Sequence, residues 1–364
     1  MHVPSALASA ALLLLAQVNT ASATPVPDTA ATSSYGSCSS PLVRKEWRTL
    51  SSKDKLAFIN ALKCMQSKPS QAQSLWAGAQ NRYDDYQGLH ISQTDFVHFC
   101  AQFLPWHRYL LYLFETDLRS TCSYTGTIPY WDWTKDATSE GAFLNSPVFD
   151  ATYGFGGNGP YIADISNFTE VLATTLPGRT GGGCVSTGPF ANVPVNMGPG
   201  NHTEYTPHCL RRDFVPSLIT QTVNSSVVAA TLQVNTFFDL DHIIQGLSLE
   251  IPGMRTHAGG HLGVGGMVGE MSNMYSSPGD PLFWLHHANL DRIWNTWQRA
   301  SWPARKTAIG GPDTMWAYPY NFFGDIPYNN ITLQTPLKYT GVASTITVST
   351  TMDIQGGPFC YSYA

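Results

Sequence analysis

The grouping of histidines along this chain constrains its fold more than any other feature of the sequence. Seven of its eleven histidines fall into three segments, as His90, His98 and His107, then His257 and His261, then His286 and His287. The second segment reads H-x-x-x-H, and an i,i+4 pair projects both side chains from one face of a helix. Helices that lie far apart in the sequence are therefore expected to converge and bring these side chains together.

Imidazole nitrogens ligate copper, zinc, iron and nickel. Six neutral nitrogen ligands, with no cysteine or carboxylate at ligand spacing, favour copper over zinc or a carboxylate-bridged iron pair, and two groups of three predict two metal ions. Taken alone, an H-x-x-x-H pair is more often surface or packing chemistry. Gly259 and Gly260 lie between the paired histidines, where each costs about 1 kcal/mol of helix propensity relative to Ala. We expect metal ligation to hold that turn.

Two longer segments resemble a known family. The stretch from His98 to Arg108, HFCAQFLPWHR, followed by Glu115, is similar to the first copper signature of tyrosinases and catechol oxidases. The stretch from Asp280 to Arg292, DPLFWLHHANLDR, resembles their second copper signature. The chain is thereby identified as a member of the type 3 copper proteins, with the resemblance covering His90 to about Arg299.

The resemblance implies a ligand set and a pocket. It assigns His90, His98 and His107 to one copper ion, and His257, His261 and His287 to the other. His286 occupies a variable position of the signature and is expected to line the pocket, together with Ala258, Leu262, Met274 and Phe283. Asp291 shares a helix face with His287 and is expected to orient either that ligand or its helix, and Arg108 and Glu115 share a face and could pair.

The predicted fold is mainly α, a four-helix bundle holding a dicopper centre, with long irregular loops and a few short β-strands. Apolar spacing and capping residues predict helices over Lys53–Met65, Gln71–His90, Pro105–Arg119, Phe237–Leu249 and from Asp280-Pro281 to about Ala300. Glycine, proline and asparagine crowd the stretch from Gly141 to Gly200, which we expect to be irregular. Short strands are expected at Ile331–Leu333 and Ser344–Val348.

The N-terminus has the features of an exported chain. Residues 1–23 contain no charged side chain and end in an A-x-A site, which predicts a signal peptide. Residues 24–42 then form an extended segment before a single copper domain over 43–364, with no C-terminal capping domain, as in the short fungal members of the family. Four sequons, at Asn167, Asn201, Asn224 and Asn330, fit secretion and a glycoprotein.

Seven cysteines in an exported chain predict up to three disulfides and one leftover thiol, although spacing alone does not fix the pairing. The pairing we expect is Cys38 with Cys360, Cys64 with Cys122 and Cys184 with Cys209, which leaves Cys100 free. The formal net charge of -5, without a run of basic residues, gives no sign of a positively charged surface that would bind nucleic acid or an anionic membrane. The partners expected are small phenolic substrates and O2, and the oligomeric state stays open.

Two departures from the family pattern bear on activity. Phe96 stands where many members carry a cysteine that forms a thioether bridge to a histidine. Ala258 stands where strongly phenol-hydroxylating members often carry an asparagine that helps to orient a basic water. Because alanine offers no hydrogen bond, we expect oxidation of o-diphenols or o-aminophenols to o-quinone-type products, with O2 reduced to water, to predominate over monophenol hydroxylation.

Three other functions remain as alternatives. A tyrosinase with substantial monophenol hydroxylase activity would use the same ligands. A haemocyanin-like oxygen carrier would also use them, but the chain lacks the extra domains of such carriers. A zinc hydrolase would need H-E-x-x-H, and Ala258 replaces that glutamate.

Overall fold

The computed structural model describes residues 38–168, 176–248, 253–321 and 324–364. The predicted signal peptide and residues 24–37 of the extended segment lie outside the described residues. Residues 38–42, the described end of that segment, are attached to the rest of the domain, because Cys38 is disulfide-bonded to Cys360 and Leu42 begins a strand.

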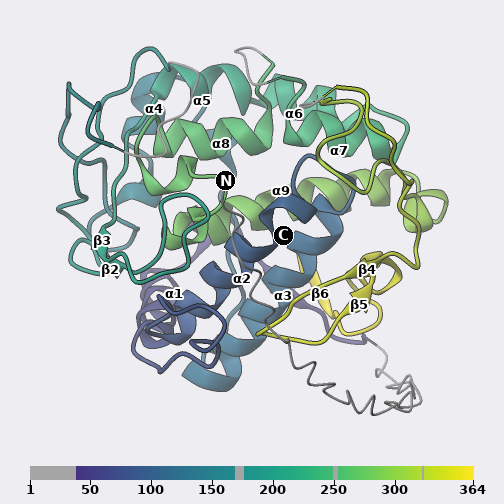
Figure 1. The fold of residues 1–364 in the computed structure, drawn as a ribbon, viewed down its shortest axis with the longest axis horizontal. Helices are drawn as coiled ribbons and strands as arrows, with labels where there is room; N and C mark the ends of the chain where they lie inside the picture. Colours follow the sequence, from purple (N-terminus) through teal and green to yellow (C-terminus); the bar gives the residue numbers. More distant parts are fainter. Residues whose placement is uncertain (1–37, 169–175, 249–252, 322–323) are drawn as a thin grey trace, which may run out of the picture. The chain divides into compact units, whose positions relative to one another are not determined.

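Four helices of the described chain carry the grouped histidines, with His98 at the C-cap of the first, which confirms the predicted helical bundle (Figure 1). They are α2 (Arg82–Val97), α3 (Phe103–Cys122), α8 (Thr256–Gly265) and α9 (Leu282–Ala300). The other helices are α1 (Ser52–Met65), α4 (Glu140–Leu144), α5 (Pro216–Thr222), α6 (Ser225–Leu232) and α7 (Phe237–Gln245).

The strands of the described chain are short and form three separate pairs. β1 (Leu42–Arg44) runs parallel to β6 (Tyr361–Tyr363), β2 (Pro194–Val195) pairs antiparallel with β3 (His208–Cys209), and β4 (Pro336–Leu337) pairs antiparallel with β5 (Ile346–Thr347). The first pair joins the two ends of the described chain. Short 3-10 turns complete the structure, of which η4 (Glu270–Ser272) and η5 (Ser277–Gly279) lie between α8 and α9.

Helix α2 begins later than its apolar spacing predicted. The expected helix over Gln71–His90 is wrong in its first half, because residues 71–81 form turns and α2 starts at Arg82. A capping box fixes that start, since the side chains of Asn81 and Asp84 each accept from the other's backbone amide. The buried carboxylate of Asp85 accepts from the amides of residues 71 and 72 and holds the preceding turn against the helix.

The C-terminal strand prediction is half right. Ser344–Val348 contains β5, but Ile331–Leu333 is not a strand. The chain turns there, because the amide of Thr332 donates to the hydroxyl of Thr335 and the amide of Thr335 donates to the carbonyl of Thr332.

The expected disulfide pairing is confirmed. Bonds join Cys38 to Cys360, Cys64 to Cys122 and Cys184 to Cys209, and Cys100 is free and buried. The first bond lies beside the β1–β6 pair and so fastens both ends of the domain. Within the irregular stretch from residue 141 to 200, four buried aromatic rings pack into the main core, namely Phe143, Phe149, Phe155 and Phe190.

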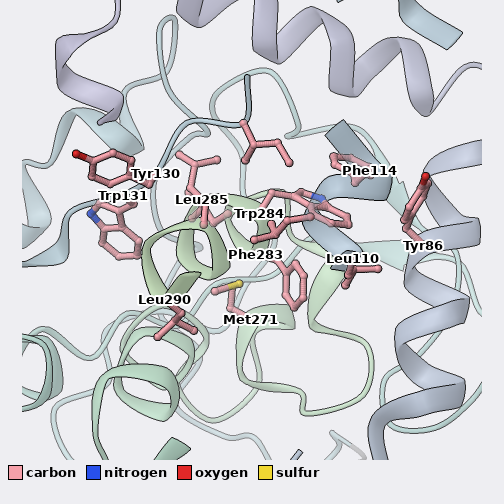
Figure 2. Close-up of a cluster of buried hydrophobic side chains, with 14 of the residues drawn as sticks. Tyr86, Leu110, Phe114, Tyr130, Trp131, Met271, Phe283, Trp284, Leu285 and Leu290 are labelled. Carbon is pink, nitrogen blue, oxygen red and sulfur yellow. The ribbon is translucent and has the colours of Figure 1, made fainter. Parts of the chain in front are cut away.

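The core that positions the bundle is aromatic (Figure 2). The indole of Trp284 on α9 stacks on Phe114 of α3 at a centroid distance of 3.5 Å and meets Tyr86 of α2 edge-on at 5.9 Å. Its Nε1–H donates to the hydroxyl of Tyr83 at 3.0 Å. These contacts fasten three of the four ligand-bearing helices together. No helix among the described residues is long and apolar enough to span a bilayer.

Candidate metal centre

The grouped histidines converge in the core as two clusters. His90 from α2, His98 at the end of α2 and His107 from α3 have ligand atoms within 4.8 Å of one another. A second cluster with the same spread contains His257, His261, His286 and His287. The clusters adjoin, because the rings of His107 and His287 stack at 4.5 Å and those of His98 and His257 at 5.8 Å.

Backbone carbonyls orient the rings of the first cluster. Nδ1 of His90 lies 2.7 Å from the carbonyl oxygen of Tyr275, and Nδ1 of His107 lies 2.8 Å from that of Phe103. Nδ1 of His98 lies 3.0 Å from the carbonyl of the residue one turn earlier. Because a carbonyl only accepts, each Nδ1 carries the proton and Nε2 keeps its lone pair. This arrangement is the one that metal-ligating histidines adopt.

In the second cluster, the ring of His261 is oriented by the same kind of hydrogen bond, because its Nδ1 lies 2.7 Å from the carbonyl oxygen of Met271. Nε2 of His261 faces Nε2 of His287 at 3.1 Å. One ligand candidate of each cluster, His90 in the first and His261 in the second, is therefore hydrogen-bonded to a backbone carbonyl of the segment 270–275. The segment Val264–Ser277 therefore supplies backbone acceptors to both clusters.

The arrangement fits metal ions. Nε2 atoms of His90, His107 and His257 are fully buried and have no hydrogen-bond partner. A buried polar atom without a partner costs free energy, and a bound cation would satisfy each of these lone pairs. Among the described residues, the two clusters contain no carboxylate or thiolate, so the donor set is imidazole alone and suits copper.

The surroundings hold the imidazoles neutral. Burial, followed by the neighbouring imidazoles, lowers the pKa of His90, His107, His257 and His287 well below the ordinary value. Burial lowers the pKa of His98 to about 4 and that of His261 to about 3. The rings are therefore unprotonated at neutral pH and available as ligands.

His286 belongs to the second cluster by distance, but its contacts differ. Its Nε2 donates to the backbone carbonyl of His257 at 3.1 Å, and its fully buried ring lies against Gly260. A Cβ on Gly260 would stand 2.2 Å from Cε1 of His286, and one on Gly259 would stand 2.0 Å from Oγ1 of Thr222. The two glycines between the paired histidines are thus required by close packing of α8 against α9 and α5, which the order of residues alone does not reveal.

The other pocket candidates occupy different places. The buried ring of Phe283 packs on His287 at 4.1 Å and on His90 at 5.2 Å, so it touches both clusters. Ala258 and Leu262 share a stripe of α8 and pack in a small apolar cluster with Met254, Met267 and others. Met274 is half-buried on the segment between η4 and η5.

Asp291 orients its helix and makes no described hydrogen bond to His287. Its buried carboxylate accepts from Nε of Arg108 at 2.5 Å and from the hydroxyls of Tyr361 and Tyr363 on β6. The suggested pairing of Arg108 with Glu115 is wrong, because Arg108 binds Asp291 whereas Glu115 accepts from the guanidinium of Arg44 at 3.0 Å. The remaining described histidines, His202, His208 and His242, lie outside both clusters.

Comparisons with known proteins agree with this geometry. The family model described as the common central domain of tyrosinase matches residues 80–300, more than half of the chain. The chain is 35% identical over 345 residues to Tyrosinase P of Aspergillus terreus, covering 90% of this chain and 93% of that protein. It is also 35% identical over 352 residues to an N-acetyl-6-hydroxytryptophan oxidase of Emericella nidulans, covering 88% and 92%.

A solved structure shares the fold. A variant of the polyphenol oxidase from Thermothelomyces thermophila superimposes with a TM-score of 0.78 at 33% identity and covers 89% of each chain. Two histidine clusters on four helices, the matching central domain and these relatives give one conclusion. The chain belongs to the tyrosinase family of type 3 copper oxidases.

Proposed function

We propose that this chain is a secreted dicopper polyphenol oxidase that converts o-diphenols, and o-aminophenols in the same way, to o-quinone-type products while O2 is reduced to water. The observation that carries the proposal is the pair of adjoining buried histidine clusters, in which the Nε2 atoms of His90, His107 and His257 lack protein partners. His90, His98 and His107 would hold one copper ion, and His257, His261 and His287 the other. A bound copper pair supplies the one-electron steps that O2 reduction needs.

The reaction balances without another reactant. Two o-diphenol molecules lose four electrons and four protons, and one O2 takes them up to give two waters and two o-quinones. The chain's own part is to hold ligands rigidly, because each Nδ1–carbonyl hydrogen bond fixes a ring before any metal binds. Phe283 contributes an apolar wall against both clusters, which keeps water from the ligand side of the rings.

Ala258 supports oxidation over hydroxylation. It follows His257 directly, is half-buried, and packs only a methyl group against the small apolar cluster around Leu262 and Met267. A methyl group neither orients a water nor accepts a phenolic proton, so a monophenol would have to be deprotonated elsewhere. Ala258→Asn is therefore expected to raise the ratio of monophenol to o-diphenol turnover, and Ala258→Val, which adds volume but no hydrogen-bonding group, serves as a control that should not.

The test is oxygen uptake by copper-loaded protein with a monophenol and its matching catechol, alongside metal analysis. We expect two copper ions per chain, rapid uptake with catechol and slow uptake with the monophenol. Rapid monophenol uptake without a lag would favour the tyrosinase alternative. Reversible oxygen binding without consumption in the presence of catechol, or zinc at full occupancy in active protein, would overturn the proposal. Because one relative is named for oxidising a hydroxytryptophan, a hydroxyindole belongs among the substrates tested.

Secretion is part of the proposal and has its own support. Three disulfides close the described domain, and such bonds persist in oxidising compartments. Asn201 and Asn330 are exposed, whereas the side chain of Asn224 caps α6 and donates to the carbonyl of Thr220. Intact mass of the exported protein should show removal of residues 1–23, and glycans at Asn201 or Asn330 in preference to Asn224.

A further inference from the structure

The turn that carries His98 from α2 into α3 has an unusual backbone. His98 ends α2 in an extended conformation, and the next residue, Phe99, has a φ of 50°. Residues with a Cβ rarely occupy this left-handed region, because the Cβ approaches the backbone closely. Such a conformation persists where surrounding contacts determine it, and it recurs at functional sites.

Gln245, the last residue of α7, holds the first half of this turn. Its side-chain oxygen accepts from the backbone amide of Phe99, and its Nε2 donates to the carbonyl of Cys100 at 3.2 Å. The side-chain amide of Gln245 thus binds two backbone groups of the turn, the N–H of the left-handed residue Phe99 and the carbonyl of Cys100. The side chain is buried, with 1% of its surface exposed, so water does not compete for these contacts.

Asp241, one turn earlier on α7, fixes the amide of Gln245. Its Oδ2 accepts from Nε2 of Gln245 at 2.7 Å, and the backbone amide of Leu104, at the start of α3, lies near this carboxyl group. Burial raises the pKa of Asp241, consistent with a carboxyl group placed in the core for its hydrogen bonds. No described cation pairs with it. The second half of the turn is held separately, since the amide of Ala101 donates to the carbonyl of Pro312 at 2.9 Å.

We propose that Gln245, backed by Asp241, is a positioning residue for His98, holding the left-handed turn so that this imidazole meets those of His90 and His107. The inference rests on the proposed copper function of the first cluster. His98 sits at the very end of α2, so the helix fixes its backbone on one side only. The clamp from α7 fixes the other side and joins it to the start of the helix that carries His107.

The test compares Gln245→Met with the native chain. Methionine keeps the length and burial of the side chain but removes the acceptor for Phe99 and the donor for Cys100. In the metal-free protein, hydrogen exchange of the segment 98–104 is expected to rise at least tenfold, with exchange of α9 unchanged. With copper, one of the two ions should bind about tenfold more weakly, so that dialysis against a chelator leaves one copper per chain.

The matched control is Gln298→Met on α9. Gln298 is equally buried, donates to the carbonyl of Met352 and accepts from Arg108, but it touches no residue of either cluster. This variant should lose stability while keeping two tightly bound copper ions. If Gln245→Met does not fold, Gln245→Glu is measured instead, and its retained acceptor should preserve slow exchange at Phe99.

The outcomes separate the two proposals. Unchanged exchange of residues 98–104 in metal-free Gln245→Met would refute the clamp, whatever the metal. Faster exchange with both copper ions retained at native affinity would also refute it, because the clamp would then not position a ligand. Failure of the native protein to bind two copper ions would instead refute the proposed function, and the exchange measurement would still decide whether Gln245 holds the turn.

Discussion

Replacing Asp291 by Asn tests whether a buried charge cluster fastens α9 to the two ends of the domain. Asp291 is 4% exposed, and Arg44 and Arg108, both fully buried, donate to its carboxylate together with Tyr361 and Tyr363. Asparagine removes the negative charge and presents an amide donor to groups that are themselves donors.

The expected cost is large. Arg44 would keep its ion pair with Glu115, but the buried guanidinium of Arg108 would be left without a carboxylate partner, and removing one partner of a buried ion pair costs about 3–5 kcal/mol. Because whole domains are stable by about 5–15 kcal/mol, Asp291→Asn should lower the unfolding midpoint in guanidinium chloride markedly at pH 7. The control is Asp353→Asn, because the exposed Arg299–Asp353 pair, at 3.0 Å, should be worth less than about 1 kcal/mol.

The pH dependence of the same variant gives a second check. Burial alone would raise the pKa of Asp291, but Arg108, Arg44 and the two tyrosine hydroxyls outweigh burial and leave that pKa lowered. A carboxyl group whose folded pKa is lowered stabilises fully above its unfolded pKa of about 4 and loses this effect as the pH falls through the folded value. The stability gap between native and Asp291→Asn protein should therefore persist from pH 8 to 5 and shrink only below about 4. A loss under about 1 kcal/mol at pH 7, or one equal to that of Asp353→Asn, would refute the reasoning.

Two further predictions concern the surroundings of the clusters. Burial lowers the pKa of His208, but the contact of its Nε2 with Glu270 at 3.2 Å raises that pKa more, so the net shift is upward. A histidine whose folded pKa is raised stabilises the fold below its unfolded pKa of about 6.5, and this stabilisation is lost as the pH rises through the folded value. In denaturant titrations, His208→Asn should therefore reduce the difference in unfolding free energy between pH 6 and pH 8 by up to about 1 kcal/mol. Gly260→Ala should destabilise the protein by about 1–2 kcal/mol, because crowding of the new Cβ against His286 exceeds the roughly 1 kcal/mol gain in helix propensity. The control is Gly141→Ala in α4, where the new Cβ has open space, and this variant should be neutral or stabilising. Equal effects of the two alanines in thermal unfolding would contradict this account.

The helices and the histidine clusters were predictable because their signals are local. Apolar spacing, Pro near the start of α9 and the i,i+4 spacing of His257 and His261 act within one or two turns of chain. Local spacing misplaced the start of α2, since apolar residues before Asn81 repeat with helical period but the capping box stops the helix there. A side-chain hydrogen bond decided a boundary that periodicity left open.

The sequence by itself determined which imidazoles are available, on which helices, and to which family the chain is similar. Only the tertiary structure decided what holds these imidazoles in place. They are oriented by the carbonyls of Met271 and Tyr275, by the close packing of His286 against Gly260, and by the hydrogen bond of Gln245 to the turn after His98. Backbone carbonyls are present at every position and leave no trace in the order of residues. Contacts across 10 to 185 positions of chain depend on how helices pack, and packing is a property of the whole core.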